Sequence, residues 1–191
     1  MVSSSSEITG LLRRWSAGDE CARDQLIPLV YEGLRELAHR RLGGAPFESS
    51  LDTTELVHEA YLRLAPGMGE RGLRNRYDFY GAAGEAMRRI LIDHARRRQT
   101  ARRGSGQSAL PLSNVAQMAD TADPAAVLAL NEAFERLESE SPDLAKLVRL
   151  RFFAGLDVAE TAKALGVSEP TVKRRWRFAR TVLFEALEGK V

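Results

Sequence analysis

Hydrophobic residues recur along the chain at helical spacing, and no segment shows the strict two-residue alternation typical of a β-strand. In the first half of the chain, these stripes and the turn residues between them predict helices over residues 8–17, 19–43 and 52–65, and a fourth from Phe79 into a basic segment. In the second half they predict helices that open at Pro124, at Ser141-Pro142, at Asp157 and at Ser168. The helix from Ser141 is expected to end at Gly155 with Phe152 facing inward, and Asp157 with Glu160 has the spacing of a helix cap. The pattern therefore predicts an all-α fold.

Residues 101–123 interrupt this pattern. They are rich in Ser, Gly, Ala and Gln and lack any apolar period, which is typical of a flexible linker. We therefore expect two small helical domains, residues 1–100 and 124–191, joined by this linker.

The run from Val158 to Leu183 has the pattern of a helix-turn-helix. Gly166 can adopt the positive φ of the turn, and Ala162 is small where the two helices cross. Ser168 caps the second helix, whose outer face carries Glu169, Thr171, Lys173, Arg174, Arg177 and Arg180. Such a face is suited to a DNA major groove. A plain trihelical bundle with a basic surface helix is the alternative.

Charge is distributed unevenly along the chain. The total is 28 Lys plus Arg against 26 Asp plus Glu, a net charge of +2, but residues 86–103 alone carry +6 and residues 168–181 carry +4. Two separate basic patches suggest two contacts with a polyanion, although solvated helix faces would explain them equally well. With so small a total charge, we expect the free protein to bind DNA weakly.

Several other classes of function are not supported by the sequence. No apolar stretch approaches the length of a membrane span, and the N-terminal serine run lacks the features of a secretory signal, so we expect a cytoplasmic protein without membrane insertion. His58-Glu59 begins like a zinc-protease motif, but the second histidine would fall at Leu62. We expect no enzymatic activity, no metal and no cofactor. Cys21, the single cysteine, is interpreted as a small buried apolar residue.

Three motifs resemble those of bacterial RNA polymerase sigma factors of the extracytoplasmic-function (ECF) type. The run Leu165-Gly166-Val167-Ser168 followed by Thr171-Val172-Lys173 and Arg180 resembles region 4.2. The segment from Glu55 to Leu64 resembles region 2.2, and Ile92-Asp93-His94 with Arg96-Arg97-Arg98 resembles the end of region 2.4. The resemblance covers both predicted units in the expected order.

The resemblance implies a non-catalytic subunit that binds core RNA polymerase, reads the minus-10 and minus-35 promoter elements and helps DNA melting. Docking on the β′ coiled coil would use Glu55, Leu56, His58, Glu59, Leu62 and Arg63. Recognition of the minus-10 element would use Tyr77, Tyr80, Arg88, Arg89, Asp93, Arg96 and Arg97, with an extruded base near the loop 66–78. The minus-35 element would be read by Ser168, Thr171, Lys173, Arg174, Arg177 and Arg180, close to the β flap. A helix-turn-helix repressor or activator that acts without core polymerase is the alternative function.

The chain also departs from the family pattern. Ala82 and Gly84 stand where most members carry aromatic residues in the helix that opens DNA, and Arg89 replaces a common asparagine. Thr53 and Thr54 occupy positions that are usually acidic. Phosphorylation by a Ser/Thr kinase would restore negative charge there; alternatively, both are unmodified first-turn residues beneath the Asp52 cap. An anti-sigma factor is a further candidate regulator.

Overall fold

The computed structural model describes residues 5–41, 52–65, 73, 75–105 and 124–188. Within these ranges every regular element is helical, which confirms the predicted all-α fold. The elements are α1 (Ser5–Ser16), α2 (Glu20–Arg41), α3 (Thr53–Leu64), α4 (Arg76–Ser105), α5 (Pro124–Glu140), α6 (Pro142–Val148), the π-helical turn η1 (Arg149–Phe153), α7 (Val158–Leu165) and α8 (Glu169–Glu188). Residues 106–123 of the predicted linker lie outside the described residues, as does the predicted end of the second helix at Gly43.

Helices α1 to α4 surround one hydrophobic core, and we call them the first unit. The α2 stripe predicted to face inward is buried, and it meets the inner faces of α3 and α4. Leu26, Leu56 and Ile90 are each fully buried in this core. At the start of α3, the Asp52 carboxylate accepts a hydrogen bond from the Glu55 backbone N–H at 2.7 Å, so the predicted N-cap is confirmed.

Helices α5 to α8 with η1 form the second unit, whose core is built around Phe134, Val148 and Ala179. A single helix was predicted from Ser141 to Gly155, with Phe152 facing inward. Instead the π-helical turn η1 adds a residue to the register, so Phe153 is buried and Phe152 only partly so. Ser141 stands at the N-cap of α6, but its side chain makes no capping hydrogen bond.

Three other expectations differ from the structure. Cys21 is exposed, because it lies next to buried Ala22 and outside the inner stripe of α2. Helix α1 begins at Ser5, earlier than predicted. Helix α4 continues into the predicted linker as far as Ser105, through alanine and arginine residues that favour helix.

No helix among the described residues combines the length and hydropathy of a membrane span.

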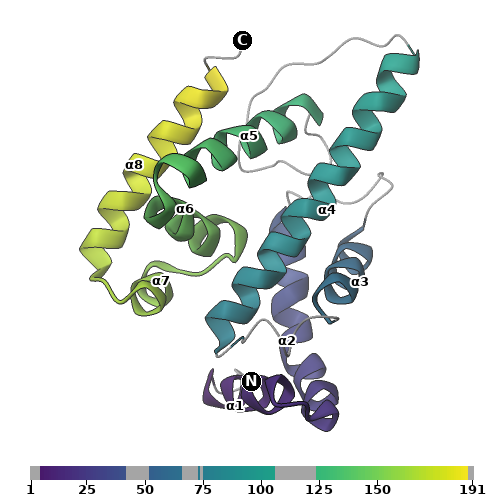
Figure 1. Ribbon diagram of the computed structural model, residues 1–191, viewed down its shortest axis with the longest axis vertical. Coiled ribbons are helices and arrows are strands. Elements are labelled where there is room, and N and C mark those ends of the chain that lie inside the picture. Colours follow the sequence, from purple (N-terminus) through teal and green to yellow (C-terminus); the bar gives the residue numbers. More distant parts are fainter. Residues whose placement is uncertain (1–4, 42–51, 66–72, 74, 106–123, 189–191) are drawn as a thin grey trace.

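Helix α4, the last helix of the first unit, also contacts the second unit. In Figure 1 it crosses the molecule diagonally, with α2 and α3 on one side and the second unit on the other. It packs against α3 within the first unit, and against α5 and η1 of the second unit. The arrangement of the two units is therefore set largely by the surface of α4.

Candidate functional site

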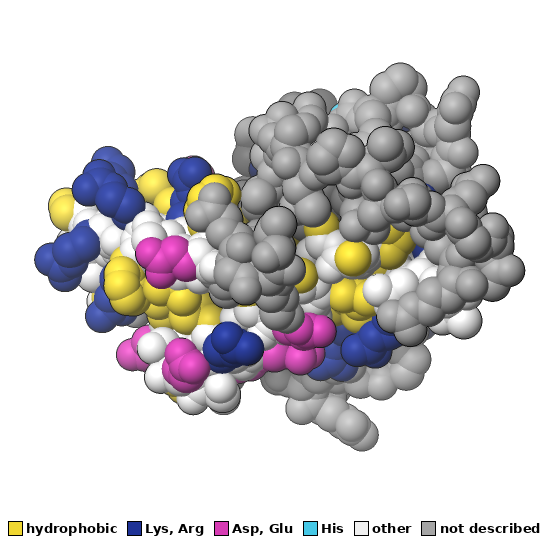
Figure 2. Space-filling model, turned by 90° about the horizontal axis from the view of Figure 1, so that it is seen from above, with side chains coloured by type: hydrophobic (Ala, Val, Ile, Leu, Met, Phe, Trp, Pro, Cys, Tyr) yellow, Lys and Arg dark blue, Asp and Glu magenta, His cyan; other side chains and the backbone are white. Residues whose placement is uncertain are grey.

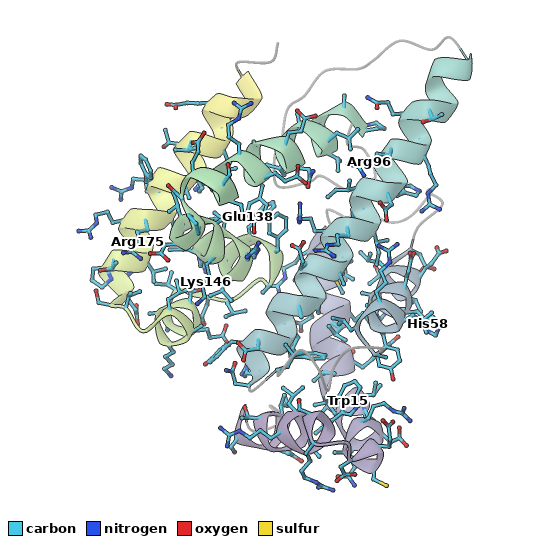
Figure 3. The ribbon with its side chains drawn as sticks, viewed as in Figure 1. Trp15, His58, Arg96, Glu138, Lys146 and Arg175 are labelled. Carbon is cyan, nitrogen blue, oxygen red and sulfur yellow. The ribbon has the colours of Figure 1, made fainter. Side chains whose placement is uncertain are left out.

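Helix α3 carries the residues that the resemblance assigns to polymerase docking. Glu55 and His58 are exposed, and Leu62 is 55% exposed although it is apolar. Figure 3 shows His58 projecting from the side of α3 that faces away from α4. Leu56 is fully buried, so its side chain holds α3 on the core and forms no part of this exposed surface.

The remaining docking candidates are Glu59 and Arg63, and Arg63 connects α3 to α4. Arg63 is exposed and donates a hydrogen bond to Glu59, one turn earlier on α3, at 2.8 Å. It also donates to Asp93 of α4 at 3.2 Å. Asp93, a predicted minus-10 residue, is therefore half-buried against α3.

The four arginines of α4 that the resemblance assigns to the minus-10 element fall into two groups. Arg89, Arg96 and Arg97 are exposed, and Figure 3 shows Arg96 on the part of α4 that extends past α2 and α3. Arg88 points into the second unit, with only 11% of its side chain exposed. Both Arg88 and Arg89 bind Glu85, at 2.7 and 3.1 Å.

The carboxylate of Glu85 responds to this environment. Burial by itself would raise its pKa, but the hydrogen bond and charge of Arg88, followed by those of Arg89, outweigh burial and lower the pKa below its ordinary value. Glu85 therefore stays ionised beside the two arginines at neutral pH.

Both tyrosines that the resemblance assigns to the minus-10 element lie in packed surroundings. Phe79 is buried in the first core and meets Tyr80 edge-to-face, with ring centroids 5.5 Å apart. Tyr77 and Tyr80 are half-buried and pack against a cluster of the second unit formed by Leu150, Ala154 and Leu156. Burial raises the pKa of Tyr80. Most of the loop expected to hold an extruded base, residues 66–72 and 74, lies outside the described residues.

The predicted capping pattern is present at the start of α7, and the predicted glycine turn joins α7 to α8. The Asp157 carboxylate accepts from the Glu160 N–H at 2.7 Å, while the Glu160 side chain accepts from the Asp157 N–H at 3.0 Å, completing a capping box. Gly166 ends α7 with a φ of 65°, in the left-handed region. Ala162 and Val172 are buried together where the two helices meet.

Helix α8 exposes the basic side chains predicted to read DNA. Lys173, Arg174, Arg177 and Arg180 are all exposed, whereas Thr171 is half-buried. The Ser168 and Thr171 hydroxyl groups form a hydrogen bond of 3.0 Å at the start of the helix. Lys and Arg side chains gather at the end of the molecule occupied by α8, with hydrophobic groups among them (Figure 2). Two phenylalanines of α8, Phe178 and Phe184, are 61% and 52% exposed.

Comparison with known proteins decides the family. The profile described as "ECF sigma factor" matches residues 5–189, which is nearly the whole chain. The chain belongs to the ECF sigma factor family.

Curated relatives of this ECF sigma factor span most of its length. The chain is 33% identical over 178 residues to the ECF RNA polymerase sigma factor SigM of Mycobacterium tuberculosis, covering 93% of this chain and 83% of the relative. It is 31% identical over 175 residues to the ECF RNA polymerase sigma factor SigF of Caulobacter vibrioides, covering 91% and 89%. No solved structure gives a significant match.

As an ECF sigma factor, the protein binds core RNA polymerase and promoter DNA and directs promoter-specific transcription initiation. A regulator that acts without core polymerase is not favoured by these matches. Among the described residues, no group of three His, Cys, Asp or Glu side chains is placed to hold a metal ion.

Sequence reasoning missed the residues that join the two units of the sigma factor. Gly84 and Arg76 of α4 and Asn131 of α5 lie at this contact, as does Glu160 of α7, which was predicted only as part of a cap. For Asn131, the sequence contained one indication of a buried position. It is a polar residue four positions after Val127 on the inner stripe of α5, and it is buried.

Proposed function

We propose that the two units divide promoter recognition between them. Residues 1–100 would act as sigma region 2 and residues 124–191 as sigma region 4, with residues 101–123 as the connection. The family match and the two basic surfaces, one on α4 and one on α8, support this division. Because its partner is core RNA polymerase, the protein would act in the cytoplasm and contribute no catalysis of its own.

The exposed side of α3 is proposed to dock on the β′ coiled coil. Its support is an exposed surface that combines acidic Glu55 with apolar Leu62, since a protein interface commonly places apolar contact inside a polar rim. Glu59 and Arg63, which bind one another, would lie at the edge of this surface nearest α4.

DNA contacts are proposed on α4 and α8. Arg89, Arg96, Arg97 and Asp93 would form the minus-10 contact together with Tyr77, Tyr80 and Arg88, and the α8 residues from Ser168 to Arg180 would read the minus-35 element near the β flap. Arginine and lysine supply the salt-dependent phosphate contacts, while tyrosine rings stack on unpaired bases and so help melting. The exposure of Lys173, Arg174 and Arg177 is the observation that most directly supports the α8 assignment.

In-vitro transcription with purified core polymerase tests this function. We expect the protein to co-purify with core and to produce transcripts from defined start sites that core alone does not produce. Absence of both results would remove the sigma function and leave the alternative of a polymerase-independent regulator.

Regulation by an anti-sigma factor or by a Ser/Thr kinase is also proposed. Thr54 is exposed and Thr53 half-buried in the first turn of α3, where an added negative charge is favoured by the helix dipole. If phosphorylation completes the docking surface, Thr53→Glu and Thr54→Glu should each strengthen binding to core polymerase, with Thr54→Gln as the uncharged control. Unchanged binding and transcription would select the alternative of unmodified first-turn residues.

A further inference from the structure

An exposed phenylalanine lies among the basic residues of α8. Phe178 is 61% exposed, whereas its neighbours Trp176 and Ala179 pack on the core of the second unit. Because Arg174 precedes Phe178 by four residues, the two side chains lie one above the other on the outer face of the helix. Thr181, three residues after Phe178, continues this face and is also exposed. Phe178 therefore belongs to the surface that presents the arginines.

The helix around Phe178 is strongly basic. Residues 173–180 contain five Lys or Arg and no Asp or Glu. Such a segment repels other basic surfaces and attracts a polyanion. An apolar contact at Phe178 therefore requires a partner that presents negative charge and apolar groups side by side.

The major groove of duplex DNA meets both requirements. Phosphates line its two edges, and each thymine presents a C5-methyl group within it, a group that phenylalanine side chains contact in protein–DNA complexes. Arg174 and Phe178 lie about 6 Å apart along the helix axis, so both fit into one groove about 12 Å wide. We propose that Phe178 is a specificity-determining residue that contacts a thymine methyl group of the minus-35 element. This role rests on the proposed reading of that element by α8.

The phenylalanine ring and the basic side chains would contribute differently to recognition. Contacts to phosphates hold α8 on the duplex whatever the base sequence, whereas the methyl group distinguishes thymine from the other bases. The ring has no hydrogen-bonding group, so its contact depends on the burial of apolar surface. Deoxyuridine lacks only this methyl group and pairs with adenine as thymine does. Its substitution for thymine therefore removes the proposed contact and leaves the base pair in place.

Replacement of single thymines by deoxyuridine tests the role of Phe178. The full-length protein bound to core polymerase is titrated with duplexes of a promoter identified by transcription, each with one thymine of the minus-35 element replaced. We expect deoxyuridine to weaken binding about fourfold at one position, the effect of losing one buried methyl group. In Phe178→Ala, the thymine and deoxyuridine duplexes should bind equally at that position. Equal affinities at every position for the unmodified protein, or a difference that persists in Phe178→Ala, would overturn the proposal.

Phe184 provides a matched control. It is another exposed phenylalanine of α8, but it lies six residues later, about 9 Å further along the helix axis and about 120° around it. Phe184→Ala should therefore keep the fourfold preference for thymine. Loss of the preference in both alanine variants would contradict a specific contact by Phe178.

Two further measurements separate the ring from its basic neighbours. Phe178→Leu keeps an apolar side chain and should retain part of the thymine preference. Phe178→Ala should leave the slope of log affinity against log salt unchanged, because no phosphate contact is lost. A reduced slope would show that the substitution displaces arginine contacts, and would overturn the proposed role of the ring.

Transcription distinguishes failure of this role from failure of the proposed function. Absence of promoter-specific transcripts from the unmodified protein would remove the minus-35 assignment and the role of Phe178 with it. Promoter-specific transcripts from a promoter that does not respond to deoxyuridine would contradict the role of Phe178 alone. If Phe178→Ala instead weakens binding to core polymerase and keeps the thymine preference, the ring contacts the polymerase and the proposal is wrong.

Discussion

Arg63 of α3 and Asp93 of α4 form an ion pair at 3.2 Å that joins the helix proposed to dock on polymerase to the helix proposed to read the minus-10 element. Arg63 uses its other terminal nitrogen for Glu59 at 2.8 Å, so one guanidinium holds two carboxylates. All three side chains are at least a third exposed. The ion pair can orient α3 relative to α4, but water screens it, so it adds little to the stability of the fold.

A double-mutant cycle of Arg63→Gln and Asp93→Asn measures this link. Because exposed ion pairs contribute little, we expect a coupling free energy below about 1 kcal/mol in urea unfolding. A coupling well above that value would mean that the pair is shielded from water. If the pair orients the two helices, Asp93→Asn should reduce transcription by more than its small loss of stability explains. A loss of transcription no larger than the loss of folded protein would argue against an orienting role.

Lys173 and Arg174 lie on the exposed surface of α8, and their replacement tests minus-35 reading. Each alanine substitution should weaken binding to a promoter identified by transcription with the unmodified protein. It should also reduce the slope of log affinity against log salt by about one for each lost phosphate contact. Lys163→Ala, which removes an exposed lysine from α7, serves as the control. Unaltered affinity in both α8 variants would exclude this face of α8 as the reader.

Features set by neighbouring residues could be predicted from the sequence, whereas contacts between the units could not. The Asp52 cap, the Asp157–Glu160 box and the turn at Gly166 depend on side chains within a few residues, and the structure contains each of them. The burial of Arg88 depends on Phe134 and Phe153, far along the chain, so its helical position gave no indication of it. Similarly, the place of Phe153 in the core depends on a π-helical turn, which a regular period of 3.6 residues does not predict.

Glu85 should make stability depend on pH in the acid range. Its pKa is lowered in the folded protein, so its stabilising effect is fully present above the ordinary glutamate pKa of about 4.3 and is lost as the pH falls through the lower folded value. We expect Glu85→Gln to flatten the acid side of a plot of unfolding free energy against pH. Since Glu85 binds Arg88, which contacts Phe153 of the second unit, we also expect Glu85→Gln to increase hydrogen exchange of the η1 amides.

Asp19 supplies a control for this effect. Its pKa is also lowered, mainly by a hydrogen bond from Arg14, and it lies between α1 and α2, outside the contact of Arg88 with the second unit. Asp19→Asn should therefore alter the dependence of the unfolding free energy on pH but leave hydrogen exchange of the η1 amides unchanged. The same response from both variants would show that Glu85 acts on folding in general and not on the interface.

Substitutions at Gly166 test whether the turn between α7 and α8 requires glycine because of its backbone conformation. An added Cβ would meet no atom within 4 Å, yet the φ of 65° is strained for a residue with a side chain. Gly166→Ala should therefore lower the unfolding free energy by about 1–2 kcal/mol. Gly166→Asn should lower it by less, because asparagine tolerates the left-handed region. Urea unfolding of the two variants makes the comparison, and minus-35 binding should weaken in the same order, since the turn sets the direction of α8. An asparagine variant as unstable as the alanine variant would show that something other than backbone strain requires glycine at this position.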